Sequence, residues 1–145
     1  MKDHHAPTVS NGRVAIDVYS FCVECGIDIS EQFLPYPLTG LSMCKKHSYS
    51  IVLHNRLSEA EKRVVMTSIL AICLDEKRKV DTLITESRSE KNKLMTRQLL
   101  MPAKTFRIEC AKWKKLGGLR PSFLAIRFGV PLVDVMSRMM DLGLT

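Results

Sequence analysis

The chain has 145 residues, a hydrophobic content of 46%, a charged content of 26% and a formal net charge of +7. These values are typical of one folded domain, or of a small metal-held module joined to a helical domain, and they exclude a disordered chain. No apolar stretch approaches the roughly 18 to 20 residues that a membrane-spanning helix requires, so we expect no membrane association.

The first segment, residues 1–13, is polar and lacks the hydrophobic core of a signal peptide. We interpret it as a flexible tail and expect a cytoplasmic protein. The apolar stretch that follows, Val14 to Phe21, predicts a short helix or strand.

Four residues in the first third of the chain are spaced like zinc ligands. Two residues separate Cys22 from Cys25 and Cys44 from His47, and 18 residues lie between the pairs. Two short knuckles with this spacing close on one tetrahedral zinc, and four protein ligands leave no open position for catalysis. The spacing therefore predicts a structural zinc. Reduced cysteines in the core or on the surface, and redox chemistry, remain the alternatives; a disulfide framework fits poorly because the count of 5 Cys is odd.

The next elements are predicted from local signals. Two prolines between Phe33 and Leu38 exclude a regular helix there. Ser50 to Leu53 predicts a strand. Ser58 and Glu61 form a capping-box pattern, which begins a helix that becomes apolar nearly all round and is therefore expected to be the central buried helix.

Further helices are expected in the second half of the chain. Pro102 interrupts a helical region that runs to Met101, and the pattern then predicts helices over Thr105 to Lys115, Ser122 to Phe128 and Leu132 to Leu142. The fold class is thus mainly α, of the α+β kind: a zinc-knuckle and β-hairpin module at residues 14–57, then a helical domain at residues 58–145.

The positive charge is concentrated in one segment. Between Glu76 and Arg120 there are 13 Lys or Arg against 5 Asp or Glu. Such an excess suits nucleic acid or an acidic protein surface as the partner, although a charged helix face can also serve only solubility.

The last two predicted helices resemble a helix-turn-helix, with Gly129 at the turn. In the second of them Arg138 is the only basic residue, and Met residues are frequent. This composition suits an adaptable contact with a protein better than recognition of DNA bases. A helical hairpin that only completes the core is the alternative. We predict partner-binding residues on the basic segment and on this hairpin: Lys112, Lys114, Lys115, Arg120, Arg127, Met136, Arg138 and Met140.

The cysteine region resembles the zinc finger of DksA/TraR-type proteins. The matching pieces are Cys22 to Ile29, a proline at position 35 or 37, and Leu41 to His47, with His47 in place of that family's last Cys. The resemblance implies a metal site. It does not imply that family's function, because its coiled-coil arm has no counterpart here.

A longer stretch resembles the ImmA/IrrE-type metallopeptidase domain. The matching pieces are Ile51 to Asn55, Leu99-Leu100-Met101-Pro102, Leu124-Ala125 with Phe128 to Val130, and Arg138 with Leu142 to Leu144. In that family the helix after the strand carries HExxH, and a later helix supplies a Glu ligand.

The catalytic residues of that family are missing. Ser68 to Ile72 stands where HExxH is expected, and the third ligand position falls near Ser89, with Glu86 and Glu90 only as offset candidates. Without these groups no catalytic zinc is held and no water is activated. The resemblance therefore implies a scaffold that is not an enzyme and has no small-molecule substrate.

The functional hypothesis follows by analogy with that family, whose members act on helix-turn-helix repressors. We expect a regulator of transcription in a bacterium, phage or mobile element that binds a repressor or another transcription component. The alternative is a zinc-stabilised regulator that binds DNA through its basic segment. An enzyme that uses the N-terminal zinc is the third possibility.

Overall fold

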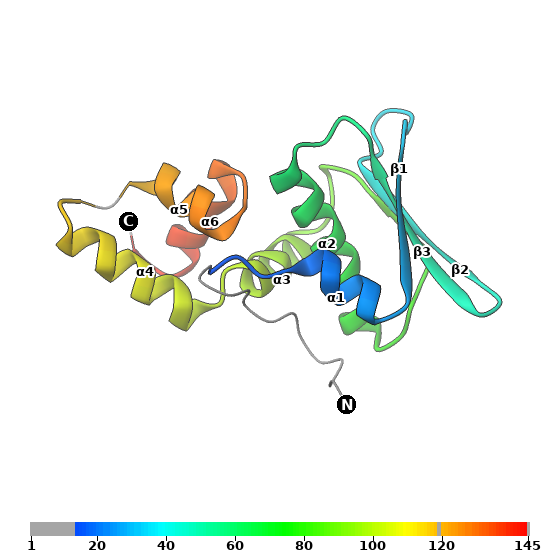
Figure 1. The fold of residues 1–145 in the computed structure, drawn as a ribbon, viewed down its shortest axis with the longest axis horizontal. Coiled ribbons are helices and arrows are strands. Elements are labelled where there is room, and N and C mark those ends of the chain that lie inside the picture. The colour runs from blue at the N-terminus through cyan, green and yellow to red at the C-terminus, as the bar shows by residue number, and fades with distance from the viewer. Residues whose placement is uncertain (1–13, 119, 145) are drawn as a thin grey trace.

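The computed structural model describes residues 14–118 and 120–144, so the tail predicted at residues 1–13 lies outside the described part. Helices and a four-stranded sheet make up an α+β structure, in agreement with the predicted fold class (Figure 1). In chain order the elements are α1 (Val18–Glu24), β1 (Ile27–Gln32), β2 (Gly40–Lys45), β3 (Ser48–His54), α2 (Glu59–Glu76), β4 (Thr82–Ile84), α3 (Glu90–Leu100), α4 (Ala103–Lys115), α5 (Pro121–Phe128) and α6 (Leu132–Asp141).

The strands form one sheet in the order β1-β3-β2-β4. β1 runs parallel to β3, whereas β2 runs antiparallel to both β3 and β4. The strand predicted at Ser50 to Leu53 lies within β3. Its alternate side chains Tyr49, Ile51 and Leu53 are buried, because a strand presents every second residue to the same face. Helices α1 to α3 lie on one side of the sheet (Figure 1).

Helix α2 is the central helix, and it begins where the capping-box pattern predicts. The Ser58 side chain accepts from the Glu61 amide at 3.1 Å, and the Glu61 carboxylate accepts from the Ser58 amide at 2.8 Å. The helix lies very close to β2 at Gly40, where a Cβ atom would stand 2.4 Å from Val65 Cγ1. A larger residue at position 40 would therefore push α2 away from the sheet.

Helix α1 covers most of the segment predicted as the first knuckle. The Asp17 side chain accepts from the Ser20 amide at 3.0 Å and caps the helix, which continues through Cys22 and ends at the C-cap residue Cys25. Val18 and Cys22, one turn apart, are both buried. The chain turns only afterwards, at Gly26, whose φ of +74° suits glycine.

Helices α4, α5 and α6 form a second lobe, seen at the left of Figure 1. The predicted hairpin of two helices is present: α5 ends at Gly129, whose φ is +64°, and Pro131 is the N-cap of α6. The rings of Phe106 and Phe128 pack at 5.3 Å between centroids. This contact joins α4 to α5.

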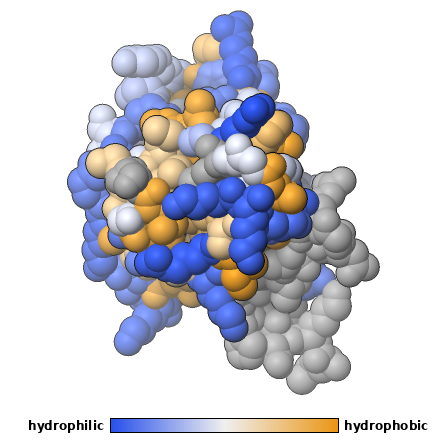
Figure 2. Space-filling model, turned by 90° about the vertical axis from the view of Figure 1, so that its left-hand side faces the viewer, coloured by the Kyte–Doolittle hydropathy of each residue, from blue (hydrophilic) through white to orange (hydrophobic). Residues whose placement is uncertain are grey.

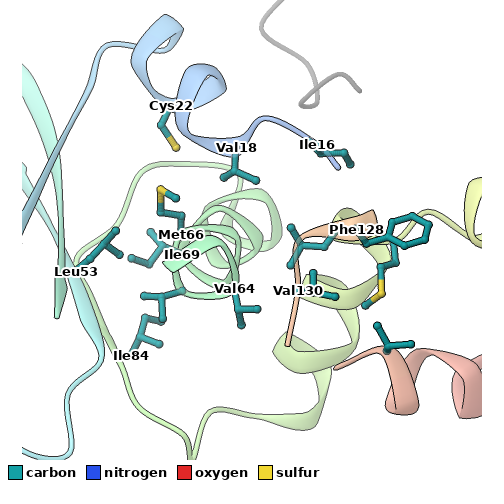
Figure 3. Close-up of a cluster of buried hydrophobic side chains, with 14 of the residues drawn as sticks. Ile16, Val18, Cys22, Leu53, Val64, Met66, Ile69, Ile84, Phe128 and Val130 are labelled. Atoms are coloured by element: carbon teal, nitrogen blue, oxygen red, sulfur yellow. The ribbon is translucent and has the colours of Figure 1, made fainter. Parts of the chain in front are cut away.

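Both lobes share one cluster of buried apolar side chains (Figure 3). It extends from Ile16 and Val18 through Ile51 of the sheet to Phe128 and Val135 of the second lobe. The cluster therefore crosses the predicted boundary between residues 57 and 58. None of the helices in the described part of the chain combines the length and apolar character that crossing a bilayer requires.

Candidate partner-binding surface and the predicted metal site

The structure separates the four predicted zinc ligands into two environments. Cys22 is fully buried, and its side chain points from α1 towards Met66 and the rest of the core (Figure 3). Cys25, Cys44 and His47 instead line one open pocket of about 360 Å³ at the end of the β2–β3 hairpin.

The electrostatics of these thiols follow from their positions. Burial raises the pKa of Cys22 to about 12, so this thiol stays protonated at neutral pH. The Cys44 amide donates to Asp81 Oδ1 at 2.7 Å, and its Sγ donates to the carbonyl oxygen of Lys79 at 3.4 Å. A zinc-bound thiol is deprotonated. Without a metal, neither the surroundings of Cys22 nor those of Cys44 favour the deprotonated form.

No group of three or more His, Cys, Asp or Glu side chains in the described residues is arranged to hold a metal ion. In this conformation the four predicted ligands therefore do not come together as a four-ligand zinc site. The zinc site stays a prediction from the spacing, and no step below depends on it.

The stretch expected to carry a catalytic motif, Ser68 to Ile72, lies inside the protein. Ser68 Oγ donates to the carbonyl oxygen of Val64 at 2.7 Å, and Asn92 Nδ2 donates to the carbonyl oxygen of Ser68 at 3.0 Å. Thr96 Oγ1 lies 3.3 Å from Ser68 Oγ and 2.7 Å from the carbonyl oxygen of Asn92. Neutral groups that bond to one another thus occupy the space between α2 and α3.

The expected third-ligand position has a structural role. Ser89 is the N-cap of α3, and its side chain accepts from the Asn92 amide at 3.1 Å. The offset candidates Glu86 and Glu90 are exposed. Neither therefore reaches the buried cluster around Ser68.

Three predicted contact residues gather at the end of α4. Lys112, Lys114 and Lys115 are exposed in its last turn. Cations at a helix C-terminus interact favourably with the helix dipole. These lysines therefore stabilise the helix whether or not they also bind a partner.

The predicted arginines have different surroundings. Arg120 is exposed, and its guanidinium carbon lies 5.6 Å from the centre of the Phe123 ring. Arg127 forms an ion pair with the nearly buried Glu109 at 3.0 Å. Arg138 is buried and donates from Nε to the carbonyl oxygen of Met101 at 2.9 Å. The prediction of Arg138 as a surface contact is therefore corrected, since its side chain lies inside the protein and holds the α3–α4 junction.

The two predicted methionines lie on the surface of α6. Met136 is 46% exposed and Met140 is 71% exposed, whereas Met139 between them is buried. Met136, Met140 and the exposed Leu132 are spaced four residues apart, so they line one face of the helix.

Helix α5 adds apolar surface that we did not predict as contact surface. Ile126 is 78% exposed and Phe123 is half-exposed. Leu124 and Phe128, one turn apart, are buried, and this spacing already indicates which face points inward and leaves Ile126 outside. Apolar side chains among charged ones are visible on this side of the molecule (Figure 2). We call the exposed apolar residues of the two helices the α5–α6 face: Phe123, Ile126, Leu132, Val133, Met136 and Met140.

No protein-family model matches this sequence, and no curated protein matches it significantly. The two resemblances noted in the sequence therefore rest on their motifs alone.

Proposed function

We propose that this chain is a non-catalytic regulator that controls transcription by binding a repressor or another protein of the transcription machinery. The observation that carries the proposal is the α5–α6 face, six large apolar side chains exposed on two adjacent helices. Large apolar side chains left exposed on neighbouring helices are typical of a protein-binding site. Met side chains suit it because they adapt to a partner's shape.

The neighbouring charge favours an acidic partner. α4 packs on α5 and ends in three exposed lysines, so a partner on the α5–α6 face would also meet a positive surface. Such charge raises association rates with acidic proteins, while the apolar contact supplies most of the affinity.

The interior between α2 and α3 supports a function without catalysis. Ser68, Asn92 and Thr96 bond to one another there, and none is an acid, a base or a metal ligand of the kind that peptide hydrolysis uses. Casein incubated with the protein should stay intact with or without a chelator. Cleavage that disappears with the chelator would contradict the proposal.

Binding can be tested with two exposed methionines. The double change Met136→Ser and Met140→Ser should weaken binding to purified helix-turn-helix repressors by about tenfold or more, since central apolar contacts dominate interface energy. The matched control is Met43→Ser, because Met43 is also exposed but lies on β2. Circular dichroism should show that both variants remain folded. Unchanged affinity in the double variant would remove the α5–α6 face from the interface.

Direct DNA binding is the second candidate function. It is favoured by the lysines at the end of α4 and by the aromatic pair of Trp113 and Phe123, whose ring centroids are 5.3 Å apart, beside Arg120. Phosphate contacts make affinity fall steeply with salt, whereas a largely apolar protein interface is less sensitive. Reversing Lys112, Lys114 and Lys115 to Glu should abolish duplex binding if DNA is the partner, and should leave the methionine-dependent binding largely intact if a protein is.

A further inference from the structure

A second hollow of the molecule lies away from the α5–α6 face, beside α2. It has a volume of about 430 Å³ and is lined by residues of α1, α2 and α3 and by the segments next to them. Thr67, Leu70 and Leu74 of α2 line it, and their spacing of three or four residues places them on one face of the helix. Lys77, the C-cap residue of α2, lines it as well. Lys77 lies ten positions after Thr67, so the hollow follows the helix for about 15 Å.

The walls are apolar along most of this length. Val18 and Phe21 come from α1, and Leu99 and Leu100 from α3. The one polar side chain from the middle of α2 is Thr67, whose Oγ1 is buried without a hydrogen-bond partner among the described residues. An apolar wall of this kind stabilises a hydrocarbon and offers little to a sugar or a nucleobase, which need several donors and acceptors.

One end of the pocket is positively charged. Lys77, Arg78 and Lys79 line it where α2 ends, and no acidic side chain is among the described lining residues. The nearby Asp75 forms an ion pair with Lys91 at 3.0 Å. Three full positive charges outweigh the roughly half negative charge of the helix C-terminus, so this end favours an anion.

The size of the hollow distinguishes between occupants. Pockets for small ligands have volumes of about 300 to 1,000 Å³, and this pocket falls in that range. A protein partner would need about 800 Å² of buried surface on each side, which a hollow of this volume cannot supply alone. The elongated apolar shape and the single charged end therefore fit a small molecule with one hydrocarbon chain and one anionic head.

We propose that this pocket binds an alkyl carboxylate of medium length, with its chain along α2 between Leu70 and Leu74 and its carboxylate at Lys77 to Lys79. The sequence predicted no small-molecule substrate. The molecule proposed here is a bound ligand and no bond is made or broken. The site is independent of the partner-binding proposal, because its residues lie on α1, α2, α3 and the segments next to them and none belongs to the α5–α6 face.

Titration calorimetry of the full chain with decanoate tests the site. We expect saturable binding of one decanoate per chain. Leu74→Trp should weaken it by about tenfold or more, because the indole fills a pocket whose wall is partly open to solvent at Leu74. Leu70→Phe is a second filling variant in case the first does not fold, and thermal unfolding of each variant reports whether it is native.

The head group is tested by changing the charge. The double change Lys77→Asn and Arg78→Gln should weaken decanoate binding by about fivefold to tenfold and leave decanol binding unchanged. Asn is chosen because Lys77 has a φ of +58°, which Asn tolerates. The control Lys112→Gln with Lys114→Gln removes the same amount of charge from α4 and should change neither decanoate nor decanol affinity.

The following results would overturn the proposal. Absence of saturable decanoate binding would overturn it, also if a protein or another segment of the chain occupies the pocket instead of a small molecule. Wild-type affinity for decanoate in both filling variants would mean that decanoate binds elsewhere. Decyltrimethylammonium binding as tightly as decanoate, or no loss of decanoate affinity in the charge variant, would rule out an anionic head.

Discussion

The Arg63 guanidinium in α2 donates from Nε to the carbonyl oxygen of Gly129 at 2.8 Å, although 66 positions separate the two residues. It also donates to the carbonyl oxygens of Phe128, at 3.2 Å, and Ile16. One side chain thus joins the central helix to the chain before α1 and to the end of α5. Neither lobe can move far from the other while these bonds persist.

Replacing Arg63 with Met should lower the free energy of unfolding by about 2 to 4 kcal/mol, because carbonyl groups at the lobe junction lose their donors. Urea unfolding measures this change. Lys104→Met is the control, since Lys104 is exposed at the start of α4 and should cost less than about 0.5 kcal/mol. Equal stability of the two variants would mean that Arg63 does not hold the lobes together.

Gly129→Ala should destabilise the protein more than Gly26→Ala. Both glycines have a positive φ, +64° and +74°, so each alanine costs about 1 kcal/mol of backbone strain. At position 129 the new Cβ would also lie 2.9 Å from Arg63 Nε, whereas nothing lies within 4 Å at position 26. We expect a further loss of about 1 kcal/mol for Gly129→Ala in urea unfolding. A smaller effect at 129 than at 26 would contradict the close contact with Arg63.

Asp141 should make the stability depend on pH in the acid range. Its carboxylate accepts from Arg97 Nε at 2.7 Å and from Arg97 Nη2 at 2.9 Å. This bond with Arg97 is the main reason why the pKa of Asp141 lies below the ordinary value of 3.8. A lowered pKa stabilises the fold above pH 3.8, and the stabilisation is lost as the pH falls through the folded-state value.

Asp141→Asn should therefore cost about 1 kcal/mol at pH 7, with the difference from wild type shrinking below pH 3.8. Chemical unfolding at several pH values measures it. Asp75→Asn is the control, because the Asp75 and Lys91 side chains are 48% and 70% exposed and their pair should contribute little. A constant difference across the acid range would rule out this role for the Asp141 carboxylate.

A matched pair of cysteine variants distinguishes a core cysteine from a zinc ligand. With Cys22 in the core and Cys44 exposed, Cys22→Ser should lower the free energy of unfolding by about 1 to 3 kcal/mol. Cys44→Ser should change it by less than about 0.5 kcal/mol. The spacing-based zinc prediction requires something else: one zinc per wild-type chain, released from both variants, with unfolding of the N-terminal part in Cys44→Ser. Metal analysis and urea unfolding of the same samples decide between them.

Local signals in the sequence were sufficient for much of the helical structure. The Ser58–Glu61 capping box places the start of α2, and Gly129 with Pro131 places the break between α5 and α6. Each of these signals acts within a few residues, so it does not depend on the tertiary fold. Strand β4, by contrast, is three residues long and is held by pairing with β2, which no local pattern reports.

The cysteine spacing was the strongest sequence signal, and a weaker one competed with it. Val18 and Cys22 are four residues apart, which is also the spacing of a helix face. In the structure that period places Cys22 in the core. The surface role of Arg138 could not be judged from sequence either, because its partner, the carbonyl of Met101, is brought near only by the tertiary fold.

The bond between Arg138 and Met101 has a consequence for the order in which the protein is completed during synthesis. α3 and α4 are separated only by Met101 and Pro102, and the carbonyl at this junction is held by a residue made 37 positions later. All four strands of the sheet, by contrast, are made before residue 101 is reached. This bond at the α3–α4 junction can therefore form only once α6 has emerged from the ribosome.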